Sequence, residues 1–108
     1  MNSPSHLIVV ALAGDLVVGM ATGVIYLHPD KPPQLWINEV GTGVEWRCRG
    51  IAKRTTLALM QEAVRQGCVE MWLGTEADNL PARAVYRALD GDETEGLVMY
   101  DWDAEDVL

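Results

Sequence analysis

The sequence predicts one α/β domain of the α+β kind, in which a mixed, mainly antiparallel sheet is combined with two helices in the order β-β-β-α-β-α-β. Three observations lead to this prediction: two β-rich runs meet at a two-residue turn, two later segments have helical spacing, and a strand lies between those helices. With 108 residues, 49% of them hydrophobic, the chain can bury one core and is too short for two. We therefore expect residues 1–108 to form a single domain.

The first half of the chain predicts three strands. The pair Gly14-Asp15 joins the first two runs as a tight hairpin, and a proline-rich loop precedes the third. Gly41 and Gly43 lie inside the third run and predict a bulge there, or a place where a ligand approaches the backbone. The three runs are residues 6–13, 16–27 and 35–44.

The second half predicts two helices and two strands. Residues 51–66 have helical spacing, and Gly67 follows them where a C-terminal cap belongs. A second helix is expected to begin at Asn79 as its N-cap, with Pro81 in its first turn. The apolar stripes at helical spacing are Leu57, Met60, Ala63 and Val64 in the first helix and Ala82, Val85, Tyr86 and Leu89 in the second. The remaining strands are predicted at residues 69–74 and 97–102.

The charges are unevenly distributed. The net charge is −8, which argues against a general nucleic-acid binder, yet four of the eight basic residues fall within eight positions. We therefore expect a local site for an anion in an otherwise acidic surface, which would attract cations. The basic residues are Arg47, Arg49, Lys53 and Arg54, whereas the last 19 residues contain eight carboxylates.

The cysteines and the N-terminal region indicate the compartment. Cys48 and Cys68 have no C-x-x-C partner and no His cluster nearby, so we expect no metal site and no disulfide framework, and place the protein in the cytoplasm. The apolar segment 7–27 is interrupted by Asp15 and has no basic residue before it, so neither a membrane helix nor a signal peptide is expected.

The turn between the third strand and the first helix is the most informative stretch. A helix N-terminus presents unpaired backbone N–H groups and a partial positive charge, which together suit an anion. Four cations at such a terminus oppose the helix dipole, and an anion between them would explain the placement, although a merely solvated helix start is the alternative. Here the segment Arg47-x-x-Gly50-x-Ala52 resembles the Q/R-x-x-G-x-G/A motif of the GNAT superfamily of acetyl-CoA-dependent N-acetyltransferases.

A second segment strengthens the resemblance. Asn79-Leu80-Pro81-Ala82-Arg83-Ala84-Val85-Tyr86 is similar to the N-x-x-A-x-x-x-Y segment of the same superfamily and follows in the required order, with a strand between the two motifs. Residues 37–40 and 98–103 look most like aminoglycoside 3-N-acetyltransferases. The sequence departs from the family by having Asp90-Gly91 where Gly-Phe is usual, and by starting at the hairpin, without the usual N-terminal strand and two helices.

The resemblance assigns candidate site residues. It implies that acetyl-CoA is the cosubstrate, that the loop amides hold its pyrophosphate, and that Tyr86 lies near its sulfur and protonates the leaving thiolate. Glu39, in the third strand, is our candidate for the base that deprotonates the amine. The alternative is a Glu on the strand face that points to solvent or pairs with an arginine, and Glu45 is the substitute base. Asn79 either contacts the cofactor or only caps its helix. The cofactor-binding residues expected are Val40, Gly41, Thr42, Arg47, Cys48, Arg49, Gly50, Ile51, Ala52 and Asn79.

We interpret the chain as an N-acetyltransferase that moves an acetyl group from acetyl-CoA to a primary amine by direct attack, without a covalent acyl-enzyme. The acidic surface favours a cationic acceptor such as an aminoglycoside, a polyamine or a peptide. Two alternatives stay open: a CoA-binding sensor or subunit without activity, and an interaction protein whose exposed strand edges pair two chains. A homodimer is expected because a second subunit could supply the missing wall of the acceptor site.

Overall fold

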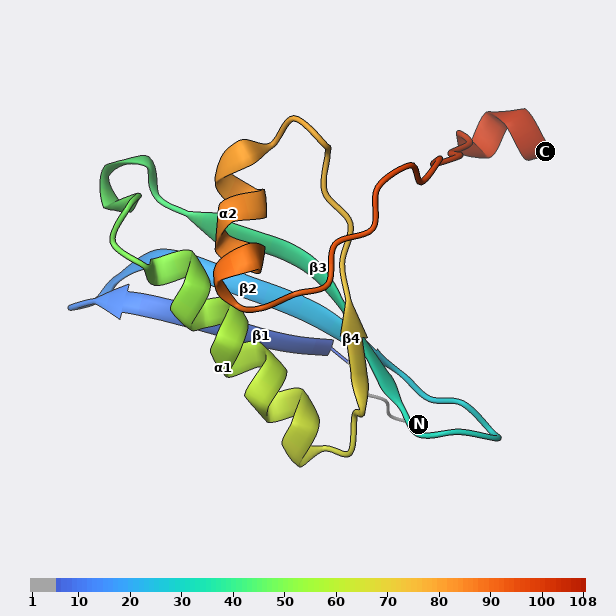
Figure 1. Cartoon of the computed structure of the whole chain (residues 1–108), viewed down its shortest axis with the longest axis horizontal. Helices are drawn as coiled ribbons and strands as arrows, with labels where there is room; N and C mark the ends of the chain where they lie inside the picture. The colour runs from blue at the N-terminus through green and yellow to red at the C-terminus, as the bar shows by residue number, and fades with distance from the viewer. Residues whose placement is uncertain (1–5) are drawn as a thin grey trace.

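The computed structural model describes residues 6–108 and has the predicted mixed α/β architecture (Figure 1). Three strands form an antiparallel meander, and a fourth joins it in parallel, which gives the sheet order β1-β2-β3-β4. Both helices lie on one face of this sheet (Figure 1). The elements are β1 (His6–Ala13), β2 (Leu16–Tyr26), β3 (Gln34–Thr42), α1 (Ile51–Arg65), β4 (Glu70–Trp72) and α2 (Leu80–Ala88), with 3-10 turns at Val44–Trp46 and Ala104–Val107. Within the described residues no helix has the length and apolar character needed to span a membrane.

The core lies between α1 and the first three strands. The apolar stripe of α1 is buried only in part, because Leu57 and Val64 are 40% and 56% exposed. The buried face is rotated toward two threonines, and the Thr55 hydroxyl donates to the carbonyl oxygens of Ile51 and Ala52 at 3.1 and 3.2 Å. Because these bonds satisfy its polar group within the helix, a threonine can occupy a core position. Leu59 and Ala63 pack with Ala21, Ile25, Leu35, Ile37 and Cys68. The buried residues of α1 are Ile51, Thr55, Thr56, Leu59 and Ala63.

Gly19 of β2 sets where α1 begins. A Cβ atom at this position would lie 2.5 Å from Cγ2 of Ile51, the first residue of the helix. Such a contact is closer than packed carbon atoms allow, so β2 and the start of α1 approach each other only because residue 19 has no side chain. The glycine therefore positions the N-terminus of α1 against the sheet.

The ends of both helices have the same capping geometry. Gly67 adopts a left-handed φ of 100°, its N–H donates to Val64 O at 3.0 Å, and the next N–H, that of Cys68, donates to Ala63 O at 3.0 Å. After α2 the equivalent bonds run from Asp90 N to Arg87 O and from Gly91 N to Tyr86 O, at 2.9 and 3.0 Å. Both are Schellman motifs, so the predicted cap at Gly67 is confirmed. The second motif places an aspartate, Asp90, at a left-handed φ of 63°.

Asp90→Gly is expected to stabilise the protein by about 0.5–1 kcal/mol, because glycine adopts the left-handed conformation without the steric cost that a Cβ atom imposes. In thermal denaturation this corresponds to a rise in Tm of a few degrees. Asp92→Gly is the control: it removes the same side chain at a position without a positive φ, and a similar gain there would contradict the explanation.

An aromatic row crosses the sheet on the face opposite α1. The Trp36 ring stacks between Tyr26 of β2 and Trp72 of β4, with ring centroids 6.1 and 4.8 Å apart. These side chains point away from the helices, since Leu35 and Ile37, the neighbours of Trp36 along β3, face the core. Tyr26 and Trp72 remain 42% and 49% exposed, so the row is an open aromatic surface that ends at the edge strand.

The predicted final strand is not formed. Residues 97–102 have no strand pairing, and Leu97, Val98, Met99, Tyr100 and Trp102 are 67–85% exposed. The segment instead leaves the body of the molecule and ends in the turn Ala104–Val107 (Figure 1). The predicted strand at residues 69–74 is correspondingly short, with only Glu70–Trp72 paired. The alternation of side chains in residues 97–102 therefore predicts an extended segment, but it does not show which strand that segment would pair with.

Candidate functional site

The sheet divides between β3 and β4, and the candidate site lies at that division. β4 pairs with β3 only over Gln34–Trp36, whereas β2 follows β3 as far as Thr42. In an antiparallel pair the N–H groups of alternate residues point toward the neighbouring strand, and those between them point to the other edge. From Ile37 onward, that other edge of β3 has no strand partner in the described part of the chain. The split therefore leaves backbone donors of β3 available to a ligand.

A cleft of about 380 Å³ lies beside this free edge. It brings together residues of β3 and α2 that are about forty positions apart in the sequence. Both predicted catalytic residues, Glu39 and Tyr86, line it, and so do three of the residues predicted to bind the cofactor. Its lining consists of Met20, Asn38, Glu39, Val40, Gly41, Gly74, Thr75, Asn79, Ala82 and Tyr86. Thr42, the third residue predicted on this strand, lies outside the lining but continues the same edge.

A β-bulge sits next to Glu39. The register changes from Thr22 opposite Glu39 to Gly23 opposite Ile37, so that Asn38 is the additional residue in β3. A bulge, the first of the two alternatives predicted for Gly41, does not occur there, because Gly41 pairs regularly with Met20; Gly41 does line the cleft. A bulge redirects the side chains that follow it and is common next to active sites. Here it brings Asn38 and Glu39 into the lining of the same cleft, where Glu39 is exposed.

α2 supplies the opposite wall of the cleft. Asn79 caps this helix, because its Oδ1 accepts a hydrogen bond from Ala82 N at 3.2 Å. Tyr86 lies two turns further along and is partly buried, which raises the pKa of its hydroxyl above the usual value of 10. Tyr86 therefore keeps its proton at neutral pH and is available as a donor.

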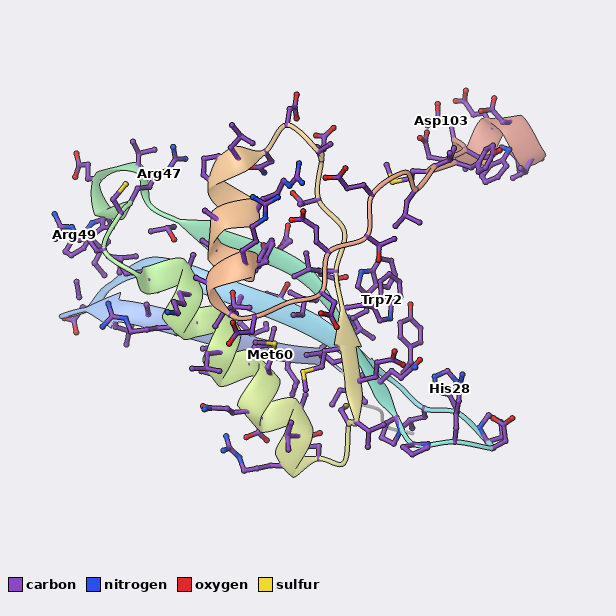
Figure 2. All side chains as sticks on the ribbon, in the orientation of Figure 1. His28, Arg47, Arg49, Met60, Trp72 and Asp103 are labelled. Atoms are coloured by element: carbon purple, nitrogen blue, oxygen red, sulfur yellow. The ribbon has the colours of Figure 1, made fainter. Side chains whose placement is uncertain are left out.

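The basic turn lies between β3 and α1, where Figure 2 shows Arg47 and Arg49 projecting into solvent. Gly50, the residue before α1, has a left-handed φ of 77°, and no side chain caps the helix start. A Cβ atom on Gly50 would meet nothing within 4 Å. The first N–H groups of α1 are therefore approachable, as an anion site requires.

The sequence did not predict the contact made by one residue of this turn or the backbone conformation of another. The Arg49 guanidinium lies 4.7 Å from the centroid of the Trp46 ring, which holds it by a cation–π interaction. Cys48 is exposed and has a left-handed φ of 64°. Lys53 and Arg54 are also exposed, so all four cations of the turn face solvent. The side chain of Ile51, the first residue of α1, is buried, so only its backbone is open to an anion.

An ion cluster on α2 was missed by the sequence analysis. Arg83 contacts Glu93 and Glu95 at 2.8 and 2.6 Å, and Arg87 contacts Glu93 at 2.7 Å. Hydrogen bonds from Arg87 and Arg83 lower the pKa of Glu93 to about 2. These pairs fasten the segment after α2 to the helix that carries Tyr86. The only sequence signal is the presence of arginines one turn apart followed by an acidic stretch, which is too common to identify the pairing.

The Glu93 pairs predict a dependence of stability on pH. Because the folded pKa of Glu93 lies below its unfolded value, its contribution is complete above about pH 4.5 and is lost as the pH falls toward 2. We expect the difference in the free energy of unfolding between wild type and Glu93→Gln to be constant above pH 5 and to shrink below it. Urea denaturation at several pH values measures this difference. Glu105→Gln, which removes a carboxylate from the C-terminal turn, should not show the same trend, and a matching trend would contradict the assignment.

A second cavity, of about 500 Å³, lies behind Tyr86. It shares Gly74, Thr75 and Tyr86 with the cleft, and the rest of its lining comes from α1, β3, β4, the loop after β4, α2 and the segment after α2. The buried Thr56 Oγ1, in its wall, has no hydrogen-bond partner among the described residues. This cavity lies at the corner where the sequence has Asp90-Gly91 in place of the Gly-Phe expected from the resemblance.

Comparisons with known proteins agree with this geometry. The model of the acetyltransferase (GNAT) family matches residues 1–90. Two curated relatives, each named aminoglycoside N(6′)-acetyltransferase type 1, from Salmonella typhimurium and Salmonella enteritidis, are 28% identical over 95 residues. The match covers 84% of this chain and 66% of theirs, so the chain spans slightly less than two thirds of their length. These relatives are named for the 6′ amine, and the predicted likeness to 3-N enzymes is not confirmed.

Solved structures give the same fold. A structure of AAC(6′)-Iy in complex with a bisubstrate analogue, CoA-S-monomethyl-acetylneamine, superposes with a TM-score of 0.80 at 25% identity, over 94% of this chain and 72% of that one. A structure described as a transcriptional regulator from Bacillus halodurans superposes with a TM-score of 0.78 at 25% identity, over 92% and 68% of the two chains.

Proposed function

The chain belongs to the acetyltransferase (GNAT) family, and we propose that it transfers an acetyl group from acetyl-CoA directly to a primary amine of a cationic acceptor. One observation carries this proposal: Glu39, Tyr86 and the free edge of β3 meet in one cleft. A base, an acid and a row of backbone donors are the three groups that acyl transfer to an amine requires.

The turn before α1 fits the pyrophosphate of acetyl-CoA. Gly50 leaves open space beside the start of the helix, and the turn and the first turn of α1 carry four exposed cations. The free edge of β3 fits the extended, amide-containing arm of the same molecule, because an extended chain can pair with an unpaired strand. When bound, acetyl-CoA supplies the thioester that is attacked. Val40, Gly41 and Thr42 would line its path, and Asn79 would act mainly by capping α2.

Each catalytic role belongs to a residue of the cleft. Glu39 accepts a proton from the ammonium group of the acceptor, directly or through water, and leaves a neutral nucleophile. N–H groups at the free edge of β3 stabilise the negative charge that develops on the carbonyl oxygen. Tyr86 donates its proton to the departing sulfur, and its raised pKa ensures that it holds that proton beforehand.

Tyr86→Phe is expected to lower kcat by about 10-fold, less than the 10²–10⁴-fold usual for general acid–base catalysis. The reason is that a thiol, with a pKa near 8.5, is a better acid than a phenol and leaves without much assistance. The acetyl-CoA dissociation constant should stay within about twofold, because the ring is retained. Steady-state kinetics with a thiol-detecting reagent measure the change, and an unaltered kcat would remove Tyr86 from the reaction.

For the acceptor we propose an aminoglycoside, with polyamines and lysine-bearing peptides as the other cationic candidates. The names of the curated relatives and the net charge of −8 support this choice. A panel containing kanamycin, spermidine and a lysine peptide, assayed for thiol release, tests it, and mass spectrometry of the product identifies the amine. We place the reaction in the cytoplasm, since Cys48 and Cys68 are both free thiols.

A CoA-binding sensor or subunit is the second candidate. Two observations favour it: Glu39 is exposed, and one structural neighbour is described as a transcriptional regulator. A CoA-dependent rise in Tm without thiol release for any amine would favour the sensor. No shift at millimolar CoA would contradict both functions.

A further inference from the structure

The cavity behind Tyr86 is larger than the cleft and borders it. Its volume is about 500 Å³, compared with about 380 Å³ for the cleft, and Gly74, Thr75 and Tyr86 line both. The two spaces are also neighbours along β3, because Ile37 lines the cavity and the next residue, Asn38, lines the cleft. Transfer of a two-carbon acetyl group uses the cleft and leaves the cavity unexplained.

The path proposed for the cofactor leads toward this cavity. The pyrophosphate is assigned to the turn that follows Thr42, and the extended arm to the edge of β3, so the arm runs from Thr42 back toward Asn38. A group that is attached to the sulfur and continues in the same direction passes Asn38 and reaches Ile37, in the wall of the cavity. In an acyl-CoA, the group attached to the sulfur is the acyl chain.

The inner wall of the cavity is apolar. Ile37 of β3, Met60 of α1 and Met71 of β4 line it, with Leu73 directly after β4. The same four residues belong to the hydrophobic core or pack against it, so this wall is held in place by the fold. Ligand pockets typically have this size and an apolar lining, and unbranched methionine side chains adapt to the shape of what they contact.

The charges around the cavity select against an anionic chain. Arg83 and Arg87 border it, and both are already paired with Glu93. Four carboxylates border it as well, so among the described residues they outnumber the two guanidinium groups. A chain that ends in a carboxylate would be repelled, whereas an uncharged chain is not. The carboxylates are those of Glu76, Asp92, Glu93 and Glu95.

One polar atom of the inner wall lacks a partner. Thr56 is 1% exposed, and within the part of the chain that the structure describes its Oγ1 makes no hydrogen bond. The other buried threonine of α1, Thr55, bonds to carbonyl oxygens of its own helix, so the lack is particular to the threonine in the cavity wall. Buried polar atoms in native proteins are nearly always hydrogen-bonded, and an oxygen on a bound chain would supply this bond.

We propose that the cavity holds the acyl chain of a donor longer than acetyl-CoA, an uncharged acyl group of medium length that carries a hydroxyl or oxo oxygen bonded to Thr56. The inference rests on the proposed function, and the reaction balances in the same way. A C–N bond forms between the acceptor nitrogen and the carbonyl carbon, and the C–S bond breaks. Glu39 takes the ammonium proton, and Tyr86 gives its proton to the sulfur.

Calorimetric titration of the wild-type protein with CoA, acetyl-CoA and hexanoyl-CoA tests whether a chain is bound. Full burial of one CH₂ group raises affinity roughly 4-fold, so the additional CH₂ groups of hexanoyl-CoA should tighten binding at least about 10-fold relative to acetyl-CoA. Equal affinities would overturn the proposal and leave the acetyl-CoA site intact, whereas no binding of any of the three would overturn the proposed function as well. Glutaryl-CoA, which ends in a carboxylate, should show no gain, and an equal gain from it would contradict the selection against charge.

Thr56→Val tests the oxygen contact, because valine has a similar shape and lacks the hydroxyl. Of the hexanoyl-CoA derivatives hydroxylated at carbon 3, 4 or 5, at least one should bind to the wild type about 5-fold more tightly than hexanoyl-CoA, the gain expected from one hydrogen bond. In Thr56→Val this preference should vanish. A preference that is absent from the wild type, or that persists in the variant, would contradict the contact.

Met60→Trp tests where the chain lies, because the larger ring fills the cavity. The gain of hexanoyl-CoA over acetyl-CoA should fall below about twofold, with the affinity for acetyl-CoA unchanged. Leu57→Trp, the control, places the same ring one turn earlier on α1, at a 40% exposed position outside the cavity lining, and should keep the full gain. Equal behaviour of the two variants would place the chain elsewhere and overturn the proposal. Circular dichroism checks the fold of both, and the wild-type titrations decide the question if Met60→Trp does not fold.

Discussion

Glu39→Gln is expected to lower kcat for acetyl transfer by about 10²–10⁴-fold, the range in which a positioned base contributes. Glutamine has the same size and can still occupy the cleft beside the Asn38 bulge, but it cannot accept a proton from the acceptor ammonium group. The acetyl-CoA dissociation constant should stay within about twofold. Single-turnover rates and isothermal titration calorimetry measure the two quantities separately.

The control for this variant is Glu45→Gln, which removes an exposed carboxylate next to the basic turn and outside the cleft lining. We expect near wild-type turnover from it. Reversed results, with full activity in Glu39→Gln and loss in Glu45→Gln, would transfer the base role to Glu45. Because neither change alters a buried residue, a loss of activity cannot be attributed to unfolding.

Gly50→Val is expected to weaken CoA binding at least about 100-fold. A β-branched residue is strained at the left-handed φ of 77°, so the turn must rearrange and the first amides of α1 move. A hydrogen bond to a charged group contributes roughly 1.5–3 kcal/mol, and losing one or two of them gives this change in affinity. Calorimetric titration with CoA measures it.

Gly14→Val is the control that distinguishes the effect of backbone strain from an effect on the CoA-binding turn. Gly14 has a similar left-handed φ, 61°, and equally open surroundings, but it lies in the turn between β1 and β2. Both variants should lose comparable stability in urea denaturation, and only Gly50→Val should lose affinity for CoA. Retained affinity in Gly50→Val would contradict the assignment of the pyrophosphate to this turn.

The parts of the fold that could be predicted are those that depend on residues close together in the sequence. The cap at Gly67 and the start of α2 at Asn79 depend on residues within one helical turn, and both are confirmed. The buried face of α1 was less accessible, because counting apolar residues overlooks Thr55, whose hydroxyl bonds to its own helix. The Asn38 bulge depends on the register between two strands, which no local pattern specifies.

The residues of the site likewise include some that local sequence predicts and some that only the three-dimensional structure shows. Tyr86 and Asn79 were predicted from a sequence motif and Glu39 from its position in the third strand, and the fold brings all three into one cleft. The bonds from Arg83 to Glu93 and Glu95 join residues ten and twelve positions apart across a turn, so they required the structure. The predicted strand at residues 97–102 was inferred from alternation, which specifies an extended conformation and does not specify its partner.

The stacked rings of Trp36 and Trp72 give the molecule an internal optical reporter. Their centroids lie 4.8 Å apart at the last paired position of β3 and β4, immediately before the two strands separate around the cleft. We expect indole transitions at this distance to couple, and a Trp36→Phe variant should change the circular dichroism spectrum if they do. Any ligand that widens or closes the gap between these strands changes the overlap of the rings. Occupancy of the site can therefore be followed spectroscopically in the unlabelled protein.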